Sequence, residues 1–333
     1  MNSFGRIFRV QIFGESHGEA VGVVIDGCPP GLALEPEAFV PDLDRRRPGK
    51  KGTTSRTEDD TPLFRSGRYG GYTTGAPLTI WFENRNARSS DYEELRSTPR
   101  PGHADLVADR KFAGFNDPRG GGHFSGRLTV ALVAAGVVAK KVILPLQVQA
   151  GLIEAGGLPD IDKALDDAMR IGDSIGGIVE CRISGVPIGL GEPFFDSVES
   201  LISHAVFAIP AVKGIEFGAG FRAAGMKGSE HNDAIIDSDG RTATNNSGGI
   251  NGGLSNGNDI LFRVAVKPTS STPAPQQTWN SGKGRQDQLK IGGRHDLCIA
   301  LRVPVVVEAV AALVLADLVL ISNAGMALTG KRP

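Results

Sequence analysis

Two long segments of small apolar residues constrain the fold of this chain more than any other feature. They read "GRLTVALVAAGVVAKKVIL" over 126–144 and "VPVVVEAVAALVLADLVLI" over 303–321. Their valine content is compatible with strands, but their length favours helices. A helix that is apolar on nearly every side is buried at the centre of a protein. Because Glu308 and Asp317 would be costly within a bilayer, we expect two core helices and no membrane span.

The remaining sequence predicts an α+β fold around these helices. Short segments, mostly rich in β-branched residues, predict strands at 20–26, 77–83, 148–154, 177–184 and 259–266. Shorter amphipathic helices are expected at 160–171 and 198–208. No segment between these elements has the composition of a linker, so we expect residues 1–333 to form a single domain.

Charge and cysteine content exclude several classes of protein. The chain has 36 basic and 37 acidic residues, a net charge of -1 and 6% aromatic residues, which argues against a nucleic-acid or membrane-surface binder. Cys28, Cys181 and Cys298 show no metal-ligand spacing and indicate a reduced compartment without disulfides. The N-terminal residues lack the apolar stretch of a signal peptide. We therefore expect a cytoplasmic protein with no metal site, no nucleic-acid partner and no membrane partner.

Glycine is unusually frequent, and it is clustered. The 45 glycines gather in "GRYGGYTTG" (67–75), "RGGGHFSGR" (119–127), "SGGINGGLSNG" (247–257) and "SGKGRQDQLKIGGR" (281–294). Any one cluster is most simply a turn. Most of these clusters contain Arg, His, Ser or Lys, which favours a binding site built from loops. The chain contains no Walker A sequence, no GxGxxG after a strand, no HExxH and no CxxC, which argues against nucleotide hydrolysis, a Rossmann cofactor and zinc chemistry.

Polar side chains near these clusters are typical of an acid/base site for an anion. His17 and His103 lie at glycine corners, "GESHG" and "RPGHAD", where a core histidine would have few packing neighbours, although a single histidine is more often structural. The run "DLDRRRPGKKGTTSR" (42–56) is rich in cations, and it is either a solvated loop or an anion site. The hydroxyls after Lys267 in "VKPTSSTPAP" could receive a phosphate or simply form a turn. These residues predict acid/base chemistry on a small polyanion, and they leave the substrate open.

Seven segments resemble, in the same order, the motifs of the chorismate synthase family. They read "GESHGEAVGVVIDGCPPG", "DLDRRRPG", "RPGHAD", "RGGGHFSGR", "GDSIGGIVE", "KPTSS" and "GRHDLC", and the resemblance runs from about Phe8 to about Asp317. It implies a β-α-β sandwich with long buried helices between two antiparallel sheets, assembled as a homotetramer. The long Gly-rich active-site loops would cover about 42–56, 85–125, 226–258 and 267–297.

The implied activity is a 1,4-anti elimination of phosphate from 5-enolpyruvylshikimate 3-phosphate (EPSP), which gives chorismate. The reaction requires reduced FMN, with NAD(P)H only as an indirect reductant. By resemblance, His17 protonates the departing phosphate, His103 protonates the reduced flavin near N1, and Asp296 is linked to flavin N5, the expected destination of the proton from C6. The implied substrate-binding residues are Arg46, Lys51, Arg100, Arg127 and Arg294. The implied FMN-binding residues are His123, Phe124, Ser125, Pro210, Ala211, Gly252, Lys267, Pro268, Thr269, Ser270, Ser271 and Arg294.

Several positions depart from the family pattern. Lys50 and Lys51 follow "RRRPG", where another arginine is usual, and lysine keeps the charge but loses the bidentate fork. His123 stands where arginine often faces the FMN phosphate, and Leu297 replaces the usual proline after the aspartate. Two other functions stay open: a polyanion- or RNA-binding module, and an NADPH-dependent flavin reductase. The neutral charge balance disfavours the first, and the lack of a large inserted segment disfavours the second.

Overall fold

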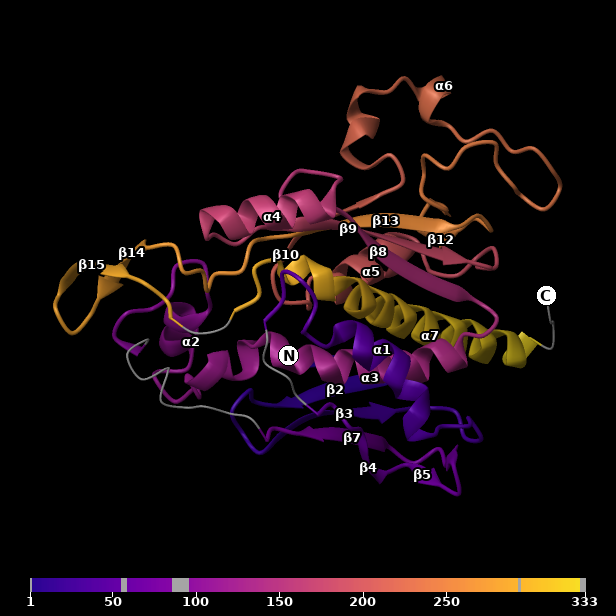
Figure 1. Ribbon diagram of the computed structural model, residues 1–333. Coiled ribbons are helices and arrows are strands. Elements are labelled where there is room, and N and C mark those ends of the chain that lie inside the picture. The colour runs from indigo at the N-terminus through magenta and orange to yellow at the C-terminus, as the bar shows by residue number, and fades with distance from the viewer. Residues whose placement is uncertain (1, 55–58, 86–95, 293–294, 330–333) are drawn as a thin grey trace.

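Two antiparallel sheets enclose a double layer of helices in the computed structural model (Figure 1), which describes residues 2–54, 59–85, 96–292 and 295–329. The first sheet has the strand order β1-β2-β3-β7-β4 and the second the order β10-β13-β9-β8. Their bounds are β1 Ser3–Phe4, β2 Arg9–Gly14, β3 Ala20–Asp26, β4 Leu63–Ser66, β7 Leu78–Glu83, β8 Gln147–Ala155, β9 Gly177–Ser184, β10 Val212–Phe217 and β13 Ile260–Val266. The five predicted strands are therefore confirmed within one or two residues.

Side-chain alternation explains how each sheet faces the helices. Along β13, Ile260, Phe262, Val264 and Val266 are buried, and the residues between them are only partly covered. Successive side chains of a strand point to opposite faces, so this sequence presents one apolar face to the interior. β7 shows the same alternation, with Leu78 among its buried residues. The two sheets thus turn their apolar faces toward each other across the helices.

The two apolar helices lie between the sheets, as the sequence predicts. α3 (Thr129–Val142) packs against β3 and β7, and α7 (Val303–Thr329) packs against β8 and β9. The helices also contact each other, and a Cβ added at Gly136 would lie 2.5 Å from the Cα of Ala309. Glycine is required there because any side chain would push the helices apart. α7 is long and apolar enough to cross a membrane, but its most apolar window is 78% buried within the protein, as expected of a core helix.

Two carboxylates of α7 are buried, and both have partners. Glu308 accepts hydrogen bonds from Arg45 (2.6 and 2.8 Å), from Lys140 (2.8 Å) and from the backbone N–H of Ala150 (2.8 Å). Asp317 accepts hydrogen bonds of 2.7–3.0 Å from three consecutive backbone N–H groups near the N-terminus, at 6–8. Buried charges require such compensation. These carboxylates therefore connect α7 to the first sheet, to α3 and to the second sheet.

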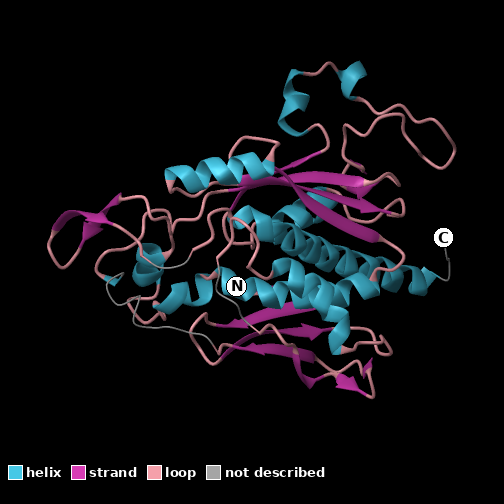
Figure 2. Cartoon of the chain, in the orientation of Figure 1, coloured by secondary structure: helices cyan, strands magenta, loops and turns pink. Residues whose placement is uncertain are grey.

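Shorter elements surround this frame (Figure 2). They are α1 Val40–Arg46, β5 Arg68–Tyr69, β6 Tyr72–Thr73, α2 Asp105–Lys111, α4 Ile161–Ile171, α5 Val198–Val206, α6 Gly228–His231, β11 Ile250–Asn251, β12 Leu254–Ser255, β14 Gln276–Asn280 and β15 Arg285–Leu289. The predicted helices at 160–171 and 198–208 correspond to α4 and α5. All four expected loops also contain regular structure: α1 covers part of 42–56, α2 lies within 85–125, α6, β11 and β12 lie within 226–258, and the hairpin β14–β15 lies within 267–297.

Local sequence signals explain why α1 is a helix, although the run of charged residues suggests a loop. Pro41 lies in its first turn, where a missing N–H costs no hydrogen bond, and Arg45 and Arg46 lie in its last turn, where cations favour the helix dipole. Arg47 is extended (ψ 145°), as expected for a residue that precedes proline. The helix therefore ends before Pro48 and orients the arginines in different directions.

Candidate active site

A cavity of about 790 Å³ lies beside the start of α3, between segments that are far apart in the sequence. Arginine, histidine, lysine and hydroxyl side chains share its wall with apolar residues of α3, α5 and α7. Of the residues suggested by the sequence, those that line it are Arg46, Arg100, His103, His123, Phe124, Ser125, Arg127, Pro210, Ala211, Lys267, Thr269, Ser270, Ser271 and Asp296. The fold thus gathers five separate motifs around one space.

Some suggested residues are not part of this lining. Lys51 is turned away, with its Nζ 2.8 Å from Asp166 and 3.7 Å from Asp162 of α4. Gly252 lies in the turn between β11 and β12, outside the cavity lining. Pro268 is not in contact with the cavity, although both its neighbours are. Arg294 lies outside the described residues.

His17 and His103 lie next to successive residues of the triple glycine 120–122. A Cβ added at Gly120 would be 2.5 Å from Cδ2 of His17, and one added at Gly121 would be 3.2 Å from Cε1 of His103. All three glycines have positive φ (60°, 82° and 52°), a conformation that other residues rarely adopt. His17 is only 6% exposed. His17 is not among the residues that line the cavity; its ring packs against Gly120, which does line it, so the few packing neighbours expected at this glycine corner are not found.

Asp105 and Arg100 orient His103 in a partly buried cluster. Its Nδ1 is 2.6 Å from Oδ1 of Asp105, and Arg100 donates to the same carboxylate through Nε and Nη2, both at 2.8 Å. Burial by itself raises the pKa of a carboxyl, but hydrogen bonds from Arg100 and His103 hold the pKa of Asp105 well below its usual range. Nδ1 of His103 also lies 3.0 Å from Nη2 of Arg100, and the other ring nitrogen, Nε2, would lie 3.4 Å from a Cβ added at Gly121.

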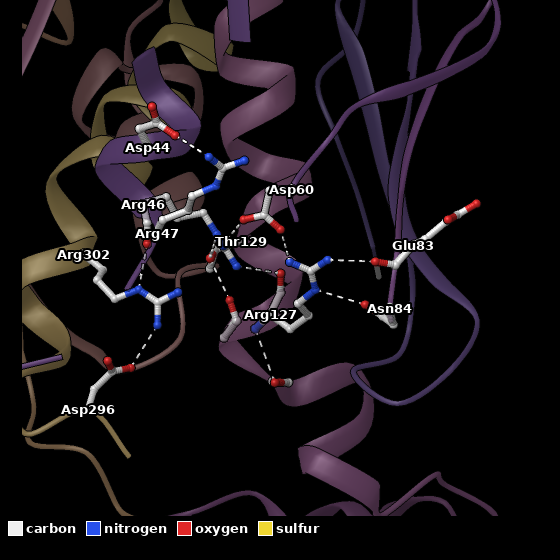
Figure 3. A network of polar contacts seen from close by, with 12 residues as sticks. Asp44, Arg46, Arg47, Asp60, Glu83, Asn84, Arg127, Thr129, Asp296 and Arg302 are labelled. Atoms are coloured by element: carbon white, nitrogen blue, oxygen red, sulfur yellow. Dashed lines mark hydrogen bonds and ion pairs between the residues drawn. The ribbon is translucent and has the colours of Figure 1, made fainter. Parts of the chain in front are cut away.

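One carboxylate joins two arginines in the cavity wall (Figure 3). Asp60, which is 1% exposed, accepts a 3.0 Å hydrogen bond from Arg46 Nη1 through Oδ2 and pairs with Arg127 Nη1 through Oδ1. Arg46 also donates to Oγ1 of Thr129 (3.1 Å), and Arg127 donates to Oδ1 of Asn84 (3.0 Å). Two guanidinium groups that share one carboxylate leave a net positive charge in this part of the wall.

Asp296 is held from two sides. Arg302 Nη1 donates to its Oδ2 at 3.0 Å, and the backbone N–H of Thr54 donates to its Oδ1 at 2.9 Å. The same guanidinium donates to the backbone carbonyl of Arg46 at 2.7 Å through Nε. Figure 3 shows Arg302 between Asp296 and Arg46. The orientation of the carboxylate is thus connected to the arginines around Asp60.

Lysine and hydroxyl groups form another part of the cavity wall. Lys267 Nζ donates to Oγ of Ser270 at 2.8 Å, and that hydroxyl donates to the carbonyl of Gly102 at 2.8 Å. Ser271 accepts from Arg100 Nη1 at 3.1 Å, which connects this loop to the His103 pair. Nδ1 of His123 lies 2.9 Å from the carbonyl oxygen of Gly14, so that side chain is anchored to β2. This wall offers hydroxyl groups and a cation, which are typical partners of phosphate.

Sequence reasoning missed three polar residues that hold the others in place. Asp105 stands two positions after His103 in "RPGHAD", so its carboxylate was visible in the motif. Arg302 falls within "RHDLCIALR", six residues after the aspartate that it pairs with. Asp60 lies in "EDDTPLF", outside every motif, and its role depends on a fold that brings 60 beside 46 and 127.

Known proteins with this arrangement are found by both sequence and structure. The model of the chorismate synthase family matches residues 8–320. A chorismate synthase from Chitinophaga pinensis is 64% identical over 97% of this chain and 98% of its own length. One from Korarchaeum cryptofilum is 46% identical over 97% of this chain and 98% of its own length.

A solved structure described as a crystal structure of chorismate synthase has a TM-score of 0.74 and 26% identity. It covers 96% of this chain, and this chain covers 93% of it. The sandwich of sheets and helices is therefore the chorismate synthase fold. Together, the family match, the curated relatives and the shared fold show that this chain belongs to the chorismate synthases, the lyases of the shikimate pathway that release phosphate from EPSP to form chorismate.

Proposed function

We propose that the 790 Å³ cavity is the place of this reaction and that it holds EPSP together with reduced FMN. The observation that carries the proposal is the turn of Gly120 and Gly121, which contacts both His17 and His103 next to the cation-rich wall. Two groups able to transfer protons thus lie beside arginines that can bind an anion.

The residues present fit a flavin phosphate. Lys267, Ser270 and Ser271 supply an ammonium and two hydroxyls, and the glycine at 102 leaves room beside them, because a Cβ there would lie 3.4 Å from Oγ of Ser270. Phe124 lines the cavity with 40% of its surface exposed and can contact a flat ring. When bound, reduced FMN supplies electron density to the allylic system as phosphate departs, without net redox change.

The roles of the polar residues follow from their positions. Arg46 and Arg127, fixed by Asp60, and Arg100, fixed by Asp105, bind the anionic groups of the substrate. His17 is not part of the lining, but it contacts Gly120, which is, and we assign to it the donation of a proton to the departing phosphate. We assign to His103 the protonation of the reduced flavin near N1. Asp296, oriented by Arg302, is the acceptor for the proton that the substrate loses. Lys51 and Gly252 are not part of this proposal, because Lys51 pairs with Asp166 of α4 and Gly252 lies in the turn between β11 and β12.

We infer the remaining properties from membership of the family: a single domain, a homotetramer, a cytoplasmic location, and a monofunctional enzyme for which NAD(P)H is only an indirect reductant. The connection of α7 to both sheets supports the single domain. Size-exclusion chromatography with light scattering measures the assembly, and a mass of one or two chains would contradict the tetramer.

The test of the function is an anaerobic reaction of the purified protein with chemically reduced FMN and EPSP. We expect chorismate and phosphate in equal amounts, and neither product with oxidised flavin. His17→Ala should remove most of the turnover while EPSP still binds. If wild-type protein binds both ligands and forms no product, the assignment of this cavity is wrong.

A further inference from the structure

The second sheet contains a β-bulge where it reaches the cavity. Val212 of β10 pairs with Val266 of β13, and Gly214 pairs with Ala265, so Lys213 is an extra residue without a partner in the ladder. Bulges redirect a side chain and are frequent next to active sites. The Lys213 side chain is exposed and lines the cavity. The bulge therefore gives the cavity a cation that a regular strand would direct elsewhere.

The backbone beside this bulge is also unusual. Ala211 has φ 74°, a left-handed conformation that costs free energy for any residue other than glycine. Its carbonyl oxygen accepts a 2.9 Å hydrogen bond from the backbone N–H of Lys267, the first residue after β13. This hydrogen bond connects the strained turn to the second lysine. A strained residue and a bulge thus occur together at the edge of the cavity.

Lys213 and Lys267 lack acidic partners. Within the described parts of the chain, neither ammonium forms an ion pair with a carboxylate, and Lys267 Nζ donates only to neutral oxygens, those of Ser270 (2.8 Å) and Pro268 (3.3 Å). Burial and the nearby charge of Lys213 lower the pKa of Lys267. Two neighbouring cations without a counter-charge repel each other, and an anion bound between them turns this repulsion into attraction.

We propose that Lys213 is a further ligand-binding residue, which binds a phosphate dianion together with Lys267 at the end of β10 and β13. The inference rests on the proposed function, because FMN and EPSP each carry one phosphate. The two lysines carry their charges on flexible side chains in one part of the cavity wall. The arginines around Asp60 present planar guanidinium groups with a fixed orientation in another part. The cavity thus has two separate sites for anionic groups.

The experiment compares ligands with and without the phosphate. Dissociation constants are measured for oxidised FMN and for riboflavin in the presence of saturating EPSP, and for EPSP in the presence of saturating oxidised FMN. The variants are Lys213→Met, Lys213→Arg and, as a matched control, Lys163→Met on the exposed face of α4. Thermal melting verifies that each variant is folded.

We expect Lys213→Met to weaken binding of one phosphate ligand by about 10-fold or more, with partial recovery in Lys213→Arg and no change in Lys163→Met. Weaker FMN binding with unchanged riboflavin binding assigns the site to the cofactor phosphate, and weaker EPSP binding alone assigns it to the substrate phosphate. Equal losses for FMN and riboflavin, or no loss for any ligand, overturn the inference. If wild-type protein forms no chorismate and binds neither ligand, the proposed function itself fails.

Discussion

At the scale of single residues, the site depends on groups that hold the reactive side chains rather than on those side chains alone. Asp105, Asp60 and Arg302 each fix a residue proposed to contact substrate or cofactor. Pre-oriented charges stabilise a transition state without reorganisation during the reaction, which is why such partners influence rate. Substitutions at these positions and at the triple glycine therefore test the site separately from ligand binding.

Replacing Asp105 by asparagine removes the charge that pairs with both Arg100 and His103. We expect kcat to fall by about 100-fold, the lower end of what a positioned acid or base contributes, with a smaller change in KM for EPSP. The measurement is steady-state kinetics under anaerobic conditions. Asp109→Asn on the same helix is the control, since within the described residues it is Asp105, and not Asp109, that pairs with Arg100 and His103. Equal kinetics for both variants would show that the pair has no catalytic role.

Gly120→Ala introduces a methyl group 2.5 Å from the ring of His17. The ring must move, so we expect kcat to drop by at least about 10-fold, whereas FMN affinity stays within about 2-fold. Gly70→Ala is the matched control, because Gly70 has nearly the same φ (56° against 60°) and open space around it. If both variants lose activity equally, backbone strain and not the position of His17 explains the effect.

At the scale of elements, the approach of α3 and α7 determines the distance between the sheets. In Gly136→Ala, the new methyl group lies 2.5 Å from the Cα of Ala309, and neither backbone can move without disturbing a sheet. Overpacking of this kind costs about 1–3 kcal/mol. We expect that loss in the free energy of unfolding, measured by urea denaturation. Gly228→Ala in α6, with open space around it, should be neutral or slightly stabilising.

Some helices and strands could be predicted from the sequence and others could not. The five strands were visible as short segments, mostly rich in β-branched residues, and the two core helices as long runs of small apolar residues, because burial on every side leaves no polar face. The hairpin β14–β15 was not predicted, because its strands, "QQTWN" and "RQDQL", are polar and lie at the surface. α1 was hidden for the same reason, since its charges masked the helix signals around Pro41.

The residues of the candidate site also fall into those that the sequence could suggest and those that it could not. Most of the suggested residues line the cavity. They could be found from the sequence because each belongs to a short contiguous motif. Lys51 could not be judged from its neighbours, since its direction is decided by Asp166, more than a hundred residues later. Asp60 is a partner of Arg46 and Arg127 only in the folded protein. Pairings over long sequence distances follow from topology, and no local pattern records them.

At the scale of the whole molecule, stability should depend on pH through buried carboxylates. Burial raises the pKa of Glu308, but hydrogen bonds and charges from Arg45 and Lys140 outweigh that effect and lower it. A lowered pKa means that the stabilisation is complete above the ordinary glutamate pKa of about 4 and is lost as the pH falls below it. Asp105 acts in the same direction.

We therefore expect the free energy of unfolding of the wild-type protein to fall between about pH 4.5 and pH 3. Glu308→Gln should lower it by about 3 kcal/mol at pH 7, because Lys140 and the partly exposed Arg45 lose their shared carboxylate. The variant should also show a weaker dependence on pH in this range. Urea denaturation at several pH values measures both effects, and parallel pH curves would exclude Glu308 as a source of acid sensitivity.

The position of α7 also has a consequence for synthesis on the ribosome. α7 follows every other described element in the chain, yet the inner face of β8 and β9 packs against it. Until α7 emerges, a nascent chain would contain the strands of both sheets, but the second sheet would lack the helix that covers its inner face. We infer that folding of the sandwich is completed only after α7 has been translated. A nascent chain without α7 would expose apolar surface that is prone to aggregation and to which chaperones bind.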